Sequence, residues 1–215
     1  MCGKITPLNA DAGENLPGDG SAGKRGAERQ TGMAAGRRGR LSKTVVMVGM
    51  MGAGKTAVGG ELARSLGVPF LDSDAEIESA ANATIAEIFA RDGEAFFREK
   101  EGQVIARLLA GAPGVLSVGG GAFLHADTRA LIRERGVAVW LKAGLDLLWN
   151  RVRRKDTRPL LRTPDPRRTL AELMDAREPA YAQADLIVEV QPDASIEETA
   201  ADVRAALATR PDVLC

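Results

Sequence analysis

The side chains best suited to chemistry lie in one glycine-rich segment, GMMGAGKT, at residues 49–56. It matches the phosphate-binding pattern G-x-x-x-x-G-K-[ST] at every fixed position. Gly52 and Gly54 let the backbone curl so that successive N–H groups point inward at phosphate oxygens. Lys55 is spaced to reach the β- and γ-phosphates, and the Thr56 hydroxyl to ligate Mg²⁺. A chance glycine-rich turn would not also have an apolar strand before it and a helix after it, so the segment predicts ATP or GTP binding.

A second reactive group is the pair Asp72 and Asp74, which follows the short apolar run Phe70-Leu71. Open α/β sheets bind ligands at the carboxyl ends of their strands. In extended chain the i, i+2 spacing points both carboxylates to one side. One carboxylate could hold magnesium or its waters, while the other accepts a hydrogen bond from a substrate hydroxyl. The alternative is a polar strand end in which Asp74 caps a helix from Ala75 onward.

Three consecutive glycines, residues 119–121, follow another apolar run. They would allow a ligand to approach the backbone closely, although a flexible turn would account for one or two of them. No apolar strand ends in the aspartate of the usual second magnesium motif, which makes Asp72 the leading candidate for that task.

Four arginines are candidates for binding an anion. Arg98 and Glu101 are three residues apart on a predicted helix, so the carboxylate could lock the guanidinium and leave its other edge for a ligand. Arg177 lies in the segment DAREPAY, where Pro179 is expected to bend or end a helix. Arg158 lies in the polar segment 155–166, and Arg151 precedes it by two helical turns. The alternative for each is a surface ion pair.

Apolar runs and helical patterns alternate from residue 44 onward. Strands are expected at 45–48, 70–71, 115–118, 137–141 and 186–190. Helices are expected at 55–66, 85–91, 94–110, 128–135, 145–154, 168–182 and 196–208. Five short strands separated by helices specify an α/β three-layer sandwich with a parallel sheet. Residues 155–166, with three prolines and no apolar stripe, have the composition of a mobile lid.

Composition narrows the class of protein. The chain has 215 residues, 29 basic and 29 acidic side chains and two cysteines, which argues against nucleic-acid binding, zinc fingers and disulfide frameworks. No apolar run approaches the ~20 residues of a membrane span, so a cytoplasmic protein is expected. Residues 1–43 hold nine glycines and eight basic against four acidic residues, which predicts a disordered N-terminal extension.

Taken together, these segments resemble the shikimate kinase family over roughly residues 44–209. The matching pieces, in the family's order and spacing, are GMMGAGKT (49–56), FLDSDAEIE (70–78), IAEIFARDGEAFFREKE (85–101), VLSVGGGA (115–122), RPLL (158–161) and AREPAYAQAD (176–185). The resemblance implies ATP-dependent phosphorylation of shikimate at its 3-hydroxyl, giving 3-phosphoshikimate and ADP in chorismate and aromatic amino-acid biosynthesis. It also implies a monomer with the fold of nucleoside-monophosphate kinases.

That fold would have strand order 2-3-1-4-5 in a domain at 44–211, with a substrate-binding part at 74–103 and a lid at about 151–166. The catalytic residues implied by the resemblance are Asp74, Lys55 and Arg158. The implied shikimate-binding residues are Asp74, Arg98, Glu101, Gly119, Gly120, Gly121 and Arg177, with Glu101 orienting Arg98. The implied nucleotide-binding residues are Gly52, Ala53, Gly54, Lys55, Thr56, Ala57, Arg151 and Arg158. Thr56 would ligate Mg²⁺, and Asp72 would support its water shell.

One residue departs from the family's pattern, and two alternative functions remain open. Asn82 stands where the family usually has glycine, and asparagine tolerates the left-handed conformation, so the turn is expected to persist. A related small-molecule kinase, such as a gluconate kinase, would share the phosphate loop and an acidic strand end. A non-catalytic nucleotide switch should have lost Asp74, Arg98 or Lys55.

Overall fold

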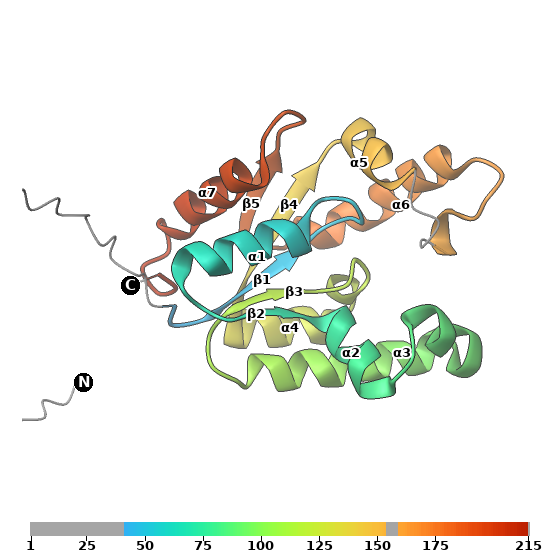
Figure 1. Cartoon of the computed structure of the whole chain (residues 1–215), viewed down its shortest axis with the longest axis horizontal. Helices are drawn as coiled ribbons and strands as arrows, with labels where there is room; N and C mark the ends of the chain where they lie inside the picture. The colour runs from blue at the N-terminus through green and yellow to red at the C-terminus, as the bar shows by residue number, and fades with distance from the viewer. Residues whose placement is uncertain (1–40, 154–158, 215) are drawn as a thin grey trace, which may run out of the picture. The chain divides into compact units, whose positions relative to one another are not determined.

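The computed structural model describes residues 41–153 and 159–214. Its centre is a five-stranded sheet in the order β2-β3-β1-β4-β5, with every neighbouring pair parallel (Figure 1). The strands are β1 (Thr44–Val48), β2 (Phe70–Asp72), β3 (Val115–Ser117), β4 (Gly136–Ala143) and β5 (Leu186–Val190). The predicted α/β class and strand order are confirmed. Residues 1–40 of the predicted N-terminal extension lie outside the described residues.

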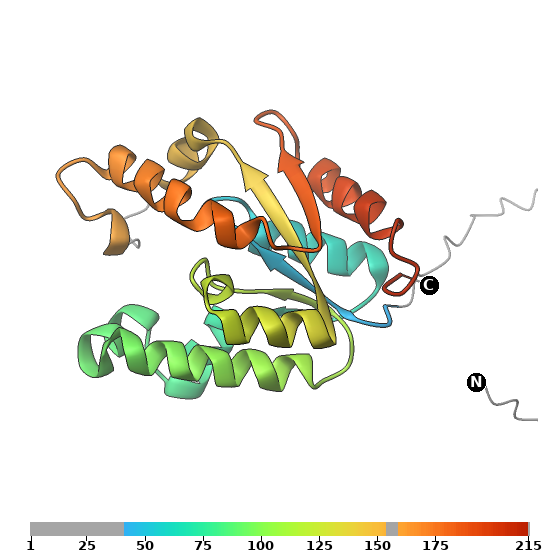
Figure 2. The same ribbon diagram turned by 180° about the vertical axis from the view of Figure 1, so that it is seen from behind.

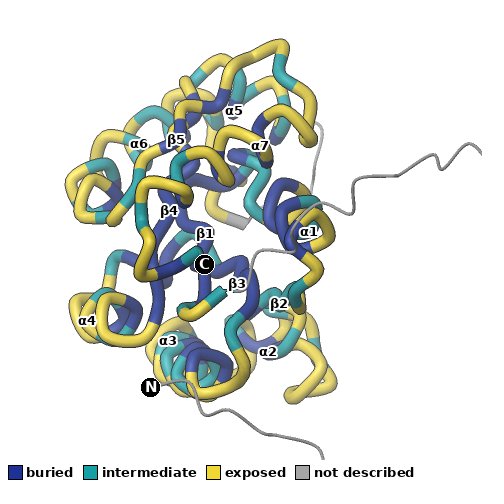
Figure 3. The backbone as a smooth tube through the Cα atoms, turned by 90° about the vertical axis from the view of Figure 1, so that its left-hand side faces the viewer, coloured by how far each residue is buried: buried dark blue, intermediate teal, exposed yellow. Residues whose placement is uncertain are grey.

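Helices cover both faces of this sheet, which is why its strands read as continuous apolar runs. All five residues of β1 are buried, since neighbouring strands and helices exclude water on every side. One face carries α1 (Lys55–Leu66) and α7 (Ile196–Leu207). The other carries α4 (Ala126–Arg135), α6 (Pro166–Tyr181) and the second half of α3 (Ile85–Leu109) (Figures 2 and 3). The predicted three layers are thus present.

Special backbone conformations end or bend several helices as expected. Gly67 ends α1 with φ 68°, and its N–H bonds back to the last turn. Asn82 ends α2 (Ser73–Ala81) with φ 45°, so asparagine does preserve the left-handed turn. Gly93, with φ 84° and ψ 169°, interrupts α3, which therefore consists of the two helices that the sequence predicts.

Four helices differ from expectation, among them α4, which begins two residues earlier than predicted. The sequence offered α2, which begins directly after β2 at Ser73, only as an alternative helix from Ala75 onward. The α5 helix (Leu145–Val152) is two residues shorter than predicted. Pro179 lies inside the last turn of α6, which continues two residues beyond it to Tyr181. Within the described residues no helix is both long and apolar enough to cross a membrane.

Candidate active site

The phosphate loop between β1 and α1 depends on glycine at three positions. Gly49, Gly52 and Gly54 have φ values of 136°, 84° and 102°, a region that side chains rarely adopt. The loop leads directly into α1, which begins at Lys55, so its backbone N–H groups lie beside the positive N-terminal end of that helix. Lys55 Nζ donates to the carbonyls of Gly49 at 2.9 Å and Met50 at 3.2 Å, so its ammonium lies across the mouth of the loop.

A cavity of about 580 Å³ opens over this loop. The predicted site residues that line it are Gly52, Gly54, Lys55, Thr56, Ala57, Asp72, Asp74, Gly119, Gly120 and Arg151. Ala53 is buried beneath it and donates its N–H to Met50 O at 3.2 Å, which closes the loop's own turn. The ends of β2, β3 and β5 and the first turns of α1, α7 and the helix after β2 thus border one space at the carboxyl edge of the sheet, as the fold class requires.

Asp72 is the residue that ties the phosphate loop to the next strand. Its Oδ2 accepts from Thr56 Oγ1 at 2.9 Å, and Thr56 Oγ1 also lies 3.3 Å from Ser117 Oγ. Its Oδ1 accepts from the N–H of Asp74 at 3.0 Å and of Ala75 at 3.4 Å. Asp72, and not Asp74, is therefore the N-cap of the following helix, which corrects the alternative considered from sequence.

Asp74 reaches the cavity by a different route from the one expected. The expectation assumed extended chain through both aspartates, but β2 ends at Asp72 and Asp74 lies in the first turn of α2. The pKa of Asp74 is raised to about 6. Burial is the largest cause, the negative charges of Asp72 and Glu101 add to it, and the positive charge of Lys55 opposes it. The result is a carboxylate whose proton affinity suits a general base near neutral pH.

The glycine turn, residues 119–121 after β3, is where predicted site residues from α2, α3 and α6 approach one another. A Cβ built on Gly119 would lie 2.6 Å from Glu101 Oε1 and 2.9 Å from Asp74 Oδ1. One on Gly120 would lie 3.6 Å from Arg177 Nη1, and one on Gly121 only 2.6 Å from Arg98 Nη2. A hydrogen bond to α2 also holds the turn in place, since the Gly119 N–H donates to Ser73 Oγ at 3.3 Å.

Arg98 is fixed by acids and aromatic rings on α3. Its Nη1 donates to Glu101 Oε2 at 2.8 Å, and its Nη2 to Glu94 Oε1 at 3.1 Å. The guanidinium carbon lies 5.2 Å from the Phe97 ring centroid and 5.9 Å from that of Phe89. Arg98 therefore has a defined orientation facing Gly121.

Glu101 is almost fully buried, with 2% of its surface exposed. Its second oxygen, Oε1, has no hydrogen-bond partner within the described residues. Burial raises the pKa of Glu101, and the Arg98 guanidinium opposes that rise. A buried carboxylate oxygen without a partner beside Asp74 and Gly119 marks the place where a donor from a ligand or water is needed.

The remaining predicted arginines differ in position. Arg177 on α6 is buried beside Gly120, although it does not line the cavity itself. Arg151 on α5 donates to the carbonyls of Gly52 and Ala53, both at 3.2 Å, so it lies against the phosphate loop. Arg158 lies outside the described residues.

Sequence reasoning missed the wall of the cavity formed by β5 and α7. Its residues are Val190, Ala194, Ser195, Ile196 and Thr199. A signal was present, because Ser195 and Glu198 form a capping box that marks the start of α7. Ser73 and Ser117, which hold Gly119 and Thr56, gave no signal beyond lying near the acidic strand end and the glycine run.

Comparison with known proteins agrees with this geometry. A family model described as shikimate kinase matches residues 51–208. A shikimate kinase of Cereibacter sphaeroides is 71% identical over 175 residues, which is 81% of this chain and 87% of that protein. One of Ruegeria pomeroyi is 70% identical over 174 residues, 81% and 89% respectively. The solved structure of Acinetobacter baumannii shikimate kinase in complex with shikimate matches with a TM-score of 0.75 and 36% identity, covering 79% of this chain and 94% of the other.

Proposed function

The chain belongs to the shikimate kinase family, and from this premise we propose which of its residues perform each part of the reaction. The reaction is the ATP-dependent phosphorylation of shikimate at its 3-hydroxyl, giving 3-phosphoshikimate and ADP in chorismate and aromatic amino-acid biosynthesis. The observation that supports the residue roles is the convergence of Asp74, Arg98 and Arg177 on the glycine turn, beside the phosphate loop. They come from α2, α3 and α6, so only the fold brings them together.

Shikimate is a carboxylate with ring hydroxyls, and the acceptor side offers a partner for each. Arg98 and Arg177 bind its carboxylate, since a planar guanidinium matches a carboxylate with paired hydrogen bonds. Glu101 keeps Arg98 in the required orientation through the 2.8 Å bond. Asp74 and the backbone of the glycine turn bind the hydroxyls.

Phosphoryl transfer needs alignment, charge stabilisation and a proton acceptor. Asp74 accepts the proton of the 3-hydroxyl while the new O–P bond forms and the bond from the γ-phosphorus to the ADP oxygen breaks. Lys55 leaves its loop carbonyls for the β- and γ-phosphates and neutralises charge on the leaving oxygen. Arg158, in the proposed lid at about 151–166, adds positive charge when that segment closes.

ATP lies over the phosphate loop, from Gly52 to Ala57. The N–H groups there face the phosphates, and Arg151 stacks on the adenine. Val190, Ala194 and Ser195 form the opposite wall of the same cavity, which supports their contact with the base or ribose.

Magnesium would be held by Thr56 directly and by Asp72 through water. The donor set fits, because a hydroxyl beside a carboxylate supplies the hard oxygens that Mg²⁺ prefers. No cluster of three acidic, cysteine or histidine ligands occurs within the described residues, which suits an ion that keeps waters and phosphate oxygens as most of its ligands. When bound, the ion neutralises phosphate charge. Loss of turnover on chelation, with recovery on adding Mg²⁺ but not Ca²⁺, would support this assignment.

We also propose the division into an N-terminal extension (1–43), a kinase domain (44–211) and a substrate-binding part (74–103). The enzyme is proposed to act as a cytoplasmic monomer that binds neither nucleic acid nor membrane. The balance of 29 basic and 29 acidic side chains supports the expectation for nucleic acid. Size-exclusion chromatography with light scattering measures the mass of the eluting protein, and a mass of twice the chain or more would refute the monomer.

A coupled ADP-release assay with shikimate, quinate and gluconate tests the proposed function. Turnover should depend on shikimate, with quinate and gluconate poor. Turnover with gluconate alone would assign the site to a gluconate kinase, and ATP binding without any acceptor-dependent turnover would refute catalysis.

A further inference from the structure

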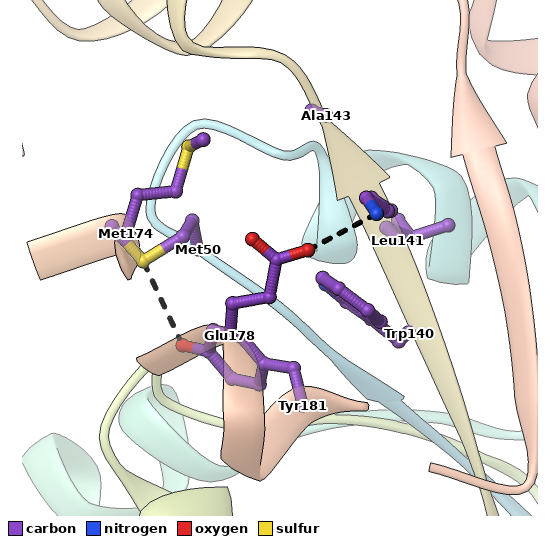
Figure 4. A pocket seen from close by; sticks show the side chains of 8 residues that line it. Met50, Trp140, Leu141, Ala143, Met174, Glu178 and Tyr181 are labelled. Atoms are coloured by element: carbon purple, nitrogen blue, oxygen red, sulfur yellow. Dashed lines mark hydrogen bonds and ion pairs between the residues drawn. The ribbon is translucent and has the colours of Figure 1, made fainter. Parts of the chain in front are cut away.

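Tyr181, the last residue of α6, connects three parts of the site. It lies four residues after Arg177, so both side chains are on one face of the helix. Its ring is 1% exposed, and its hydroxyl donates to Gly120 O at 2.5 Å. The same oxygen lies 3.9 Å from Met50 Sδ in the phosphate loop (Figure 4). A phenol has one hydrogen, and the near carbonyl is a far better acceptor than a thioether sulfur.

The bond to Gly120 O fixes more than one atom. That carbonyl and the N–H of Gly121 belong to one planar trans peptide, so holding the oxygen fixes where the N–H points. Neither the Gly120 N–H nor the Gly121 N–H has an acceptor within the described residues. Gly120 lines the cavity, where its own N–H can reach an acceptor molecule, and the direction of the neighbouring Gly121 N–H is set by the peptide that Tyr181 holds.

The surroundings of Tyr181 prevent its ring from moving away. The Trp140 ring packs against it with centroids 5.9 Å apart, and the ion pair Lys142–Glu178, at 3.1 Å, closes the outer side. The cavity left between these residues measures about 20 Å³, room for roughly one water (Figure 4). Burial also raises the pKa of the Tyr181 phenol, against the effect of Arg177, so it stays a donor at neutral pH.

We propose that Tyr181 is a positioning residue for the acceptor: its hydroxyl orients the Gly120–Gly121 peptide toward the shikimate hydroxyls and keeps that peptide in register with Arg177. The inference rests on the proposed function and deepens it. It predicts a contribution to acceptor binding that is separate from the contribution of the ring to the core.

The variant Tyr181→Phe removes the hydroxyl and keeps the ring. The KM for shikimate should rise about two- to tenfold, the range expected when one hydrogen bond is lost, while the KM for ATP stays near that of the parent. Leu170→Val, a buried substitution on the same helix, is the control for lost stability. It should lower the melting temperature and leave the KM for shikimate unchanged.

A KM for shikimate that moves no more in Tyr181→Phe than in Leu170→Val would overturn the inference while leaving the proposed function intact. If the parent enzyme itself fails to phosphorylate shikimate, the proposed function fails instead. A second measurement avoids substitution. Tyr181 is the only tyrosine in the chain, so labelling with 3-fluorotyrosine gives a single ¹⁹F resonance. It should shift saturably as shikimate is added, and a resonance unmoved at saturating shikimate would refute the coupling.

Discussion

Replacing Asp74 by Asn should change activity and stability in opposite directions. The carboxylate lies between Asp72 and Glu101 and is largely buried, which is why its pKa is about 6. An ionised group in that position is held at a cost to the fold, because neighbouring negative charges and lost solvation disfavour it. Asn is nearly isosteric and neutral. It removes that cost together with the proton acceptor.

The size of both effects follows from the site. Raising a pKa from 3.8 to about 6 corresponds at most to about 3 kcal/mol of destabilisation at neutral pH. Solvent screening of a partly accessible carboxylate reduces this, so Asp74→Asn should stabilise the fold by about 1–2 kcal/mol. Loss of a general base typically costs about 10²- to 10⁴-fold in turnover. ATP affinity should remain near that of the parent.

The sign of the pH dependence makes the test specific. Since the folded pKa is raised, the folded state binds the proton more tightly than the unfolded chain between about pH 4 and 6. The destabilising effect of Asp74 is therefore complete above pH 6 and fades as the pH falls toward 4. Urea unfolding at pH 7 and pH 4.5 should show the stability gain of Asp74→Asn shrinking at the lower pH.

The matched control is Asp72→Asn, which also removes one carboxylate from the cavity. Asp72 caps α2 and accepts from Thr56, so this change should destabilise the fold by about 1 kcal/mol. If Asp74→Asn were less stable than the parent at pH 7, or retained near-normal turnover, the account of Asp74 as a buried charge kept for catalysis would be wrong.

Three further predictions concern the same site. In the parent enzyme, kcat/KM for shikimate should fall about tenfold per pH unit below pH 6, because protonated Asp74 accepts no proton; a flat profile down to pH 5 would contradict this. Arg98→Ala should raise the KM for shikimate by more than about tenfold with ATP affinity unchanged, by the usual strength of charged hydrogen bonds; an unchanged KM would refute the carboxylate clamp. Gly121→Ala should raise the KM for shikimate as well, since its Cβ would lie 2.6 Å from Arg98 Nη2, whereas Gly102→Ala, with open space around it, should not; equal effects would count against steric displacement of Arg98.

Much of the fold could be predicted because its signals are local. The glycine pattern at 49–56, the left-handed residues Gly67 and Asn82, and the kink at Gly93 each follow from the conformational needs of a single position. The strands are short apolar runs separated by helices, which is enough to specify a covered parallel sheet. The order of those strands came only from resemblance, since nothing in a run such as 115–118 says which neighbour it pairs with.

The site was harder to predict from sequence than the fold, because its contacts join residues that lie far apart in the chain. Both aspartates that the sequence singled out line the cavity, but the reason given for their common direction was wrong. The chain turns into α2 between them, and one oxygen of Asp72 caps that helix. Tyr181 and Gly120 are 61 residues apart, and no pattern links a tyrosine at a helix end to a carbonyl in a distant turn. The wall at Val190 and Thr199 belongs to the cavity only because α7 packs beside α1.

The glycine turn shows that a prediction from sequence can rest on an incomplete reason. From sequence, residues 119–121 were expected to let a ligand approach the backbone. None of the three has a positive φ, so their backbone conformation does not require glycine. What requires it at two of the three is space for side chains: Glu101 and Asp74 at Gly119, and Arg98 at Gly121, whereas a Cβ on Gly120 would make only an ordinary contact with Arg177. Any Cβ at Gly119 or Gly121 would displace a group that binds or orients the acceptor, so we expect alanine there to damage acceptor binding before it damages folding.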